Sequence, residues 1–283
     1  MKIGVIGLGL IGGSFCKTVK KNSDYLVFGY DINELTVLKA QMTNAIDGVL
    51  DETSVLGVDL LIVATNPNVF ESAVKRFLPL LKDGATVIDF CGTKTSVVLA
   101  MQNMAKTYKN IKFFGGHPMA GREFSGFDRS TSTLFSKASM ILVPVSSDIF
   151  DNDRVKKLFL ELGFLEVVFT TSENHDKVIA YTSQLCHIVS NAFIKSETSQ
   201  KHYGYSAGSY KDLTRVARLD SEMWSVLMLE NKDNLLNELE TLINNLQVYK
   251  EALKNGDKLA LKTALQEGND IKIAIDFSNT KQK

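Results

Sequence analysis

The chain has 283 residues, of which 45% are hydrophobic, and its 32 Lys and Arg residues balance its 32 Asp and Glu residues. This length allows one or two domains with a substantial core, and the zero net charge argues against a nucleic-acid or anionic-membrane partner. The three cysteines match no metal or redox spacing, Met1 leads straight into a predicted strand, and no apolar run approaches a membrane span. We therefore expect a cytoplasmic globular protein without a bound metal.

The first residues carry the pattern of a dinucleotide-binding unit. A short apolar strand ending at Ile6 is followed by three glycines in G-x-G-x-x-G spacing and by a predicted helix. The first glycine permits a tight turn, the second lets backbone approach a pyrophosphate, and the third lets the helix pack on the strand. The N–H groups at the helix start then face the phosphates. The predicted cofactor-binding loop consists of Gly7, Leu8, Gly9, Leu10, Ile11 and Gly12.

A second predicted strand, 25–30, ends at Asp31, which lies 19 residues after Gly12. This is close to the spacing of a carboxylate that binds the cofactor's ribose. A carboxylate would repel a 2′-phosphate, and the next residues, Ile32 and Asn33, supply no arginine, so we expect NAD rather than NADP. Two alternatives remain open: a glycine-rich turn without a ligand, and Asp31 as the cap of the next helix.

Strands and helices continue to alternate as far as Thr170. The pattern predicts helices at 33–42, 70–81, 97–106 and 153–162, and strands at 59–64, 84–90, 111–116, 140–144 and 166–169. Such alternation indicates an α/β domain, 1–170, with a Rossmann-type doubly wound parallel sheet. Thr65 ends the strand 59–64 at the edge where such sheets bind ligands, which makes it a further cofactor-site candidate.

From residue 171 to 283 the periodicity is helical, which predicts a second, all-α domain. Thr170 and Glu173 could form the capping box of its first helix, and the last residues, 273–283, are expected to fray. A polar line on that first helix comprises Asp176, Ser183, His187 and Ser190. A later helix around 235–253 has an apolar stripe wider than one neighbour needs, which indicates burial within the domain or across a dimer interface.

Three positions outside the nucleotide motif could carry chemistry. His117 follows a strand of the sheet, near the edge where a nicotinamide would project, and could be a general base or a loop histidine bonded to backbone. His187 could border a cleft or be structural. Arg215 could clamp a carboxylate bidentately, with Lys211 on the same helix face, or both could belong to a solvated basic face.

On these residues the chain resembles the prephenate/arogenate dehydrogenase family. The resemblance covers nearly the whole length and rests on the glycine motif with Asp31, on GGHPMAGREFSG (115–126), on ENHDKVIAYTSQLCH (173–187) and on YKDLTRVARLDSEMWSVLMLEN (210–231). It implies a nucleotide domain followed by a helical dimerisation domain, and hence a homodimer. It also implies NAD-dependent oxidative decarboxylation of prephenate to 4-hydroxyphenylpyruvate, a step of tyrosine biosynthesis.

The resemblance assigns roles to individual residues. His117 matches the catalytic histidine that bonds the substrate's ring hydroxyl, and Arg215 matches the arginine that holds the ring carboxylate. The other matched positions are His187 as a substrate-site histidine, Asp176 as an acid beside it, Glu123 as a gating or pH-sensitive acid, and Lys211 and Asp212 as neighbours of the arginine.

The sequence departs from the family pattern at two places. The loop Cys91-Gly92-Thr93-Lys94 has glycine where many members have a serine, and Thr93 and Ser96 are the candidate substitutes in the substrate site. The family's S-H-x-P-H signature reads Ser183-Gln184-Leu185-Cys186-His187, so its first histidine is absent. Three rival functions stay open: arogenate as substrate, a β-hydroxyacid dehydrogenase with a lysine base, and an NAD-binding sensor without turnover.

Overall fold

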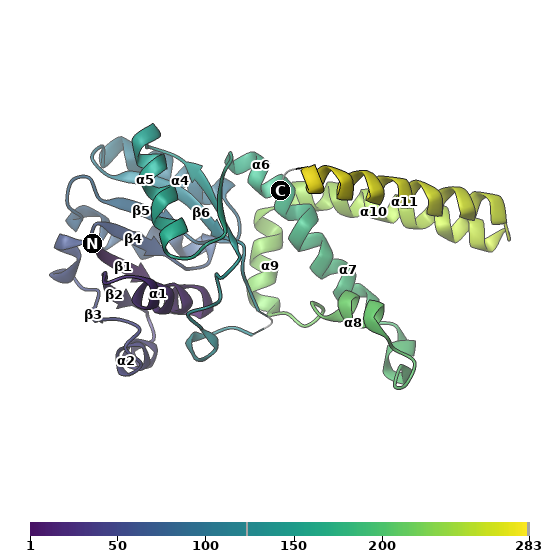
Figure 1. The fold of residues 1–283 in the computed structure, drawn as a ribbon, viewed down its shortest axis with the longest axis horizontal. Coiled ribbons are helices and arrows are strands. Elements are labelled where there is room, and N and C mark those ends of the chain that lie inside the picture. Colours follow the sequence, from purple (N-terminus) through teal and green to yellow (C-terminus); the bar gives the residue numbers. More distant parts are fainter. Residues whose placement is uncertain (123, 282–283) are drawn as a thin grey trace. The chain divides into compact units, whose positions relative to one another are not determined.

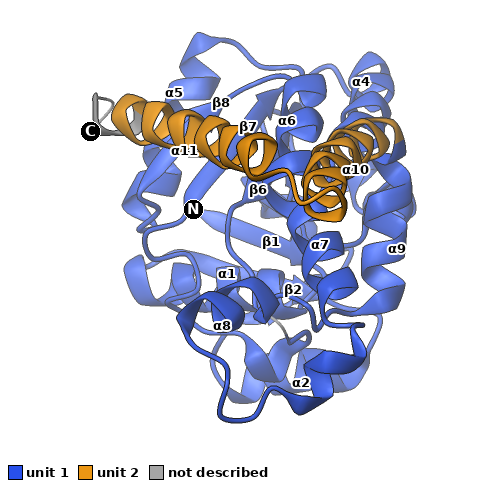
Figure 2. Cartoon of the chain, turned by 90° about the vertical axis from the view of Figure 1, so that its right-hand side faces the viewer, with its two compact units in different colours: residues 1–232 blue, residues 233–283 orange. Residues whose placement is uncertain are grey.

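The computed structural model describes residues 1–122 and 124–281 and is drawn in Figure 1. The chain divides into two compact units, Met1–Lys232 and Asp233–Lys283, coloured blue and orange in Figure 2. The predicted boundary at residue 170 lies inside the first unit and stays a prediction. No helix within the described ranges is both long and apolar enough to cross a membrane.

The first unit is built on an eight-stranded sheet with the order β3-β2-β1-β4-β5-β6-β7-β8. The order reverses between β1 and β4, as in a doubly wound fold, so the predicted α/β fold is confirmed. The strands are β1 (Lys2–Ile6), β2 (Leu26–Tyr30), β3 (Gly48–Val49), β4 (Leu60–Val63), β5 (Thr86–Asp89), β6 (Lys112–Pro118), β7 (Ser139–Pro144) and β8 (Glu166–Phe169).

One strand departs from the expected parallel arrangement. β7 runs antiparallel to β6, while the other neighbouring pairs are parallel. The segment between these two strands contains one short 3₁₀ turn, η4 (Phe127–Arg129), in its described part. A parallel return usually contains a crossover helix, and the described part of this connection contains none.

Helices cover both faces of the sheet. One core packs α1 (Leu10–Asn22), α2 (Glu34–Met42) and α5 (Ile149–Glu161) against one face, and a second core packs α3 (Phe70–Lys75) and α4 (Thr95–Thr107) against the other. Successive β4 residues alternate between the two cores, which explains why this strand is uniformly apolar. Short 3₁₀ turns, η1 (Ser54–Gly57), η2 (Pro67–Val69) and η3 (Leu78–Leu80), link these elements. The helix predicted over 70–81 ends early because Pro79 cannot continue it.

The rest of the first unit is helical: α6 (Ser172–Ile179), a π-helical segment η5 (Ala180–Leu185), α7 (Cys186–Phe193), η6 (Glu197–Lys201), α8 (Gly208–Thr214) and α9 (Ser221–Glu230). The cap of α6 is Thr171, whose hydroxyl accepts from the Asn174 N–H, and not Thr170 as predicted. Thr170 instead extends the strand pairing by donating its N–H to the carbonyl of Leu142. The π segment widens one turn, so the predicted polar line is not continuous.

The second unit is a helical hairpin of α10 (Lys232–Lys254) and α11 (Lys258–Lys281). The first residue of α10 still belongs to the first unit. Gly256, with a φ of 61°, makes the turn, and the Tyr249 hydroxyl donates to the carbonyl of Ala264 on the other helix. The expected fraying from residue 273 is wrong as far as residue 281, where α11 remains helical and Lys272 pairs with Asp276 one turn on. Residues 282 and 283 lie outside the described residues.

Candidate active site

The glycine loop has the geometry that its spacing predicts. Gly7 has a φ of 86°, which a side chain rarely tolerates, and a Cβ on Gly12 would lie 1.8 Å from the Gly7 carbonyl oxygen. The start of α1 therefore lies directly against the turn after β1. A Cβ on Gly9 would meet nothing within 4 Å, so the middle of the loop borders open space.

Asp31 is oriented toward this loop. Its Oδ2 accepts a hydrogen bond from the Leu8 N–H at 2.8 Å and its Oδ1 accepts from the Asn33 N–H at 2.9 Å. The alternative of Asp31 as a helix cap is wrong, because Asn33 caps α2 by accepting from the Leu35 N–H. The carboxylate thus lies between the glycine loop and α2, where a ribose bound at the loop would reach it.

These residues fit a dinucleotide. Leu10 and Ile11 open α1 without an acidic residue in the first turn, which leaves the positive end of the helix suited to phosphate. Thr65 follows the end of β4 by two residues. Its Oγ1 is buried and has no hydrogen-bond partner within residues 1–122 and 124–281. The sheet edge thus offers open space at Gly9 together with hydrogen-bonding groups, namely the N–H groups of the helix start, the Asp31 carboxylate and this hydroxyl.

A methyl group at Gly9 is expected to weaken cofactor binding without disturbing the fold. In Gly9→Ala the new Cβ fills the space for the pyrophosphate, while no protein atom lies within 4 Å of it. We expect the Kd for NAD⁺ to rise at least about tenfold and the Tm to stay within a few degrees. Calorimetric titration measures the affinity. Gly57→Ala, whose Cβ meets only the Lys2 side chain at 3.4 Å, is the matched control. Unchanged NAD⁺ affinity in Gly9→Ala would place the phosphates elsewhere.

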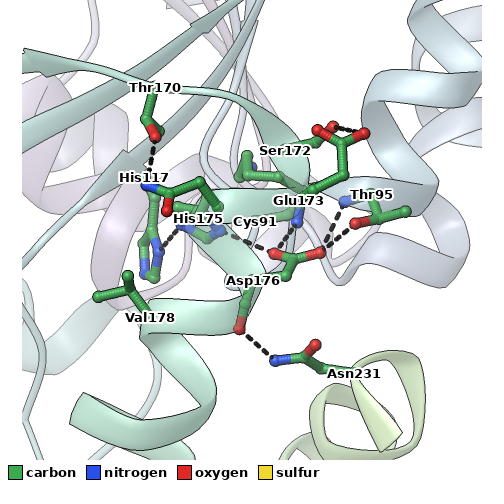
Figure 3. A network of polar contacts seen from close by, with 12 residues as sticks. Cys91, Thr95, His117, Thr170, Ser172, Glu173, His175, Asp176, Val178 and Asn231 are labelled. Carbon is green, nitrogen blue, oxygen red and sulfur yellow. Dashed lines mark hydrogen bonds and ion pairs between the residues drawn. The ribbon is translucent and has the colours of Figure 1, made fainter. Parts of the chain in front are cut away.

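His117 lies near the end of β6 in a chain of three side chains (Figure 3). Its Nδ1 is 2.9 Å from Nε2 of His175, and Nδ1 of His175 is 2.7 Å from Oδ1 of Asp176. This contact of His117 is therefore with a side chain, and not with backbone as in the alternative of a loop histidine. His175 was not among the predicted site residues, although the adjacent His-Asp pair at the start of a helix was a signal for it.

Asp176 is held from four directions. Its Oδ1 also accepts from the Lys94 N–H at 2.8 Å, and its Oδ2 accepts from the N–H at 2.8 Å and the hydroxyl at 2.6 Å of Thr95. The carboxylate thus caps the first turn of α4 and is itself only 2% exposed. These protein donors bond both oxygens and Asp176 contacts His175, so the predicted contact of Asp176 with substrate stays a prediction.

The electrostatics keep both imidazoles neutral. Burial, together with the nearby His175 and the charge on Lys94, lowers the pKa of His117 well below its usual 6.5. Burial also lowers the pKa of His175, against the opposing effect of its hydrogen bond to Asp176. Burial opposes ionisation of Asp176, but the hydrogen bonds from His175, Thr95 and Lys94 lower its pKa below the usual value, so it is a carboxylate.

A buried ion pair lies next to this network. Lys94 Nζ pairs with Asp89 Oδ2, and both side chains are fully buried. The Asp89 carboxylate also accepts from the N–H groups of Cys91 and Gly116, at 2.9 and 3.0 Å. Gly116 precedes His117, so the pair fixes the end of β5 against the end of β6. Sequence analysis missed it because nothing in the local pattern marks Lys94 as buried.

His187 and Arg215 are brought together by the helical part. The Nδ1 of His187 lies 3.0 Å from the carbonyl oxygen of Val216, and its ring lies 3.9 Å from the ring of Trp224. The Arg215 N–H donates to the carbonyl of Lys211, and both side chains are exposed at the end of α8.

The loop after β6 reaches this same segment. The guanidinium of Arg218 lies 5.1 Å from the centroid of the Phe124 ring. Phe124 follows His117 by seven residues and Arg218 follows Arg215 by three. The structure therefore places the histidine's loop against the arginine's segment, as a shared pocket requires.

The remaining candidates are placed as follows. Thr93 is 1% exposed, and its hydroxyl makes no hydrogen bond in the described part of the chain, so its contact with substrate stays a prediction. Ser96 is exposed. The space that a Cβ of Gly92 would take is bordered by Leu227 of α9, at 3.1 Å. Glu123 lies outside the described residues.

Gln184 stands at the position of the absent signature histidine and has a structural role. Its amide nitrogen donates to the carbonyl of Leu227 at 2.9 Å, and its Oε1 accepts from Asn231 at 2.9 Å. Asn231 also donates to the carbonyl of Asp176 at 2.8 Å. This buried pair therefore fastens the end of α9 to the π segment and to α6.

Comparison with known proteins agrees with this arrangement. Residues 15–165 match the family model of the prephenate dehydrogenase nucleotide-binding domain, and residues 171–267 match that of the prephenate dehydrogenase dimerization domain. A prephenate dehydrogenase of Lactococcus lactis subsp. cremoris is 30% identical over 98% of this chain and 78% of its own length. A cyclohexadienyl dehydrogenase of Zymomonas mobilis subsp. mobilis is 30% identical over 96% of this chain and 95% of its own.

The similarity extends to a solved structure with ligands. A prephenate dehydrogenase from Aquifex aeolicus, crystallised in complex with hydroxyphenyl propionate and NAD⁺, superposes with a TM-score of 0.83 at 29% sequence identity. The match covers 97% of this chain and 98% of that one.

Proposed function

The chain belongs to the prephenate dehydrogenase family, and we propose that it catalyses the NAD-dependent oxidative decarboxylation of prephenate to 4-hydroxyphenylpyruvate. The observation that carries this proposal is the neutral, half-buried His117 at the sheet edge that also bears the glycine loop, with its own loop against the Arg215 segment. The sensor without turnover would not need a desolvated imidazole there.

The nucleotide site proposed for NAD consists of the glycine loop, Asp31 and Thr65. The loop and the start of α1 would hold the pyrophosphate, and Asp31 would accept from the ribose hydroxyls. When bound, the nicotinamide supplies the acceptor for the hydride that leaves the hydroxyl-bearing ring carbon. A negatively charged Asp31 beside the ribose disfavours a 2′-phosphate, which supports NAD over NADP.

His117 would act as the general base. As the ring carbonyl forms, the hydroxyl O–H bond breaks and its proton passes to the imidazole. The C–C bond to the ring carboxylate then breaks and CO₂ leaves. The released electron pair completes an aromatic ring as the carbonyl becomes a phenolate oxygen, which takes the proton back from the imidazole. Arg215 would hold the carboxylate through charge-assisted hydrogen bonds. His187, whose ring contacts the Val216 carbonyl, and Lys211, one turn before Arg215, would bind the remaining anionic group.

Turnover assays test the proposal directly. NADH formation, followed by absorbance, is measured with prephenate and with arogenate, each with NAD⁺ and with NADP⁺. We expect NADH from prephenate with NAD⁺. Turnover of arogenate alone would establish the second candidate substrate, which the similarity to a cyclohexadienyl dehydrogenase keeps in view. Binding of NAD⁺ without turnover of either compound would contradict an enzymatic function.

The pH dependence of kcat/KM follows from the pKa of His117. The base must be neutral, and because its folded-state pKa lies well below 6.5, the neutral form persists as the pH falls through that value. We expect kcat/KM for prephenate to stay constant from about pH 8 to below 6.5 and to decrease only at lower pH, as the imidazole becomes protonated. An acid limb centred at 6.5 or above would show that the base is a solvated group.

We propose that the second unit forms a homodimer interface. Its two helices expose many large apolar side chains, more than a solvated hairpin would carry: Leu236, Ile243, Leu246, Val248, Leu253, Leu259, Leu265, Ile271, Ile273, Ile275 and Phe277. The matched dimerization-domain model covers most of this unit. Analytical ultracentrifugation is expected to give twice the mass of one chain, and the Ile243→Glu/Leu246→Glu variant is expected to be monomeric. A monomeric parent would contradict the interface.

We further propose a cytoplasmic location. All three cysteines carry free thiols in the structure, and free thiols persist in the reducing environment of the cytoplasm. Two of them, Cys16 and Cys91, are buried, and burial raises the pKa of the Cys16 thiol to about 12. These two thiols are therefore inert core side chains.

A further inference from the structure

The hydrogen bonds around Asp176 determine which ring nitrogens carry protons. An ionised carboxylate can only accept, so the contact with His175 requires a proton on Nδ1 of His175. Because His175 is neutral, its Nε2 then carries a lone pair. The 2.9 Å contact from this atom to Nδ1 of His117 requires that His117 donate. His117 therefore carries its proton on Nδ1 and its lone pair on Nε2.

We propose that His175 is a positioning residue: held by Asp176, it fixes His117 in the tautomer whose Nε2 can accept the proton of the substrate hydroxyl. This inference rests on the proposed function for the identity of the substrate, but not for the tautomer. The proton of the substrate goes to Nε2 of His117, and the proton on Nδ1 stays in place as a donor to His175. The bond to His175 then becomes charge-assisted, which stabilises the imidazolium.

The anchor of this chain is independent of His175. Three donors other than His175 hold the Asp176 carboxylate, namely the N–H of Lys94 and the N–H and hydroxyl of Thr95. Its orientation is therefore set by the start of α4. Figure 3 shows the resulting order, from Thr95 through Asp176 and His175 to His117. Both ring nitrogens of His175 and Nδ1 of His117 are committed to these hydrogen bonds, so neither ring can reverse its tautomer without breaking one of them.

Two substitutions of His175 distinguish the role of its hydrogen-bond acceptor from the role of its size. His175→Phe keeps a ring but removes the acceptor, so His117 can take the wrong tautomer. We expect kcat to decrease by about 10²–10⁴-fold, with KM for prephenate within a few-fold. In His175→Gln the side-chain oxygen can accept from Nδ1 of His117, and we expect kcat at least about tenfold above that of His175→Phe. His202→Phe, a change at an exposed histidine, is the control and should retain parental kcat.

A spectroscopic readout tests the tautomer without turnover. ¹⁵N-histidine NMR of the parent, with the four histidines assigned by single substitutions, should show the His117 proton on Nδ1. The same proton should remain there in His175→Gln and become mixed between the nitrogens in His175→Phe. A parental proton on Nε2 of His117, or a kcat of His175→Phe within threefold of the parent, would overturn the proposal.

The two readouts also separate this proposal from the proposed function. If the parent shows the Nδ1–H tautomer but does not oxidise prephenate, the function fails and the positioning role stands. Should His175→Phe fail to fold, as judged by circular dichroism and NAD⁺ binding, the parental spectrum and His175→Gln still decide. Equal kcat losses in folded Phe and Gln variants would overturn the acceptor role.

Discussion

The His117→Asn variant is expected to lose at least about a hundredfold in kcat while its KM for prephenate stays within a few-fold. Asparagine keeps a polar side chain near the same position and can still hydrogen-bond His175, but it cannot take a proton. The loss therefore falls on the step in which the ring hydroxyl is deprotonated, and substrate binding through Arg215 is left intact. Steady-state NADH formation at saturating NAD⁺ measures both constants.

His202→Asn serves as the matched control for this experiment, because His202 is exposed and its ring contacts Ser206 and Tyr210. It should behave as the parent. A kcat of His117→Asn equal to that of the parent would refute the assignment of the base. A large rise in KM with an unchanged kcat would make His117 a binding group only.

The second large effect is expected from Arg215→Ala, which should raise KM for prephenate about 10- to 150-fold. This range corresponds to the loss of a charge-assisted hydrogen bond worth about 1.5–3 kcal/mol. The carboxylate leaves as neutral CO₂, so a tighter grip on its charge would oppose the reaction, and we expect kcat to change much less than KM.

Arg154→Ala is the control for the arginine variant. Arg154 pairs with Asp151 and contacts Thr86 at the amino end of β5, the opposite end of the strand from the site. Loss of this exposed side chain should leave both constants unchanged. If KM of Arg215→Ala also stayed at the parental value, the carboxylate would be held by another residue.

The nucleotide site was predictable because its determinants are local. The glycine spacing fixes the turn, and the distance from Gly12 to Asp31 is set by one helix and one strand, so the structure returns the predicted loop with Asp31 bonded to Leu8. The position of His117 was predictable for a similar reason, since a polar residue that ends a buried strand lies at the ligand-binding edge of such a sheet.

The support of His117 was not predictable, because it depends on residues that are distant in sequence. His175 follows His117 by 58 residues, and Asp176 reaches Lys94 across 82. The helical periodicity placed Asp176 and His187 on one line, but the π segment between them breaks that line. Asp176 consequently faces α4, while His187 contacts Val216 and Trp224.

Other departures have equally specific causes. The predicted cap Thr170 is already committed to the sheet through the Leu142 carbonyl, so the helix begins one residue later. The buried pair of Lys94 and Asp89 could not be read from the pattern, because an isolated lysine in a loop is normally solvated. Its burial follows only from the approach of β6 to the end of β5.

The central claim is that one small ring compound contacts both His117 and Arg215. A crystal structure of the His117→Asn variant with NAD⁺ and unreacted prephenate tests it most directly. The account predicts that the ring hydroxyl lies within hydrogen-bond distance of residue 117, facing the nicotinamide, and that the ring carboxylate pairs with the guanidinium of Arg215. Prephenate bound with its hydroxyl away from residue 117, or with its ring carboxylate on another cation, would contradict the account.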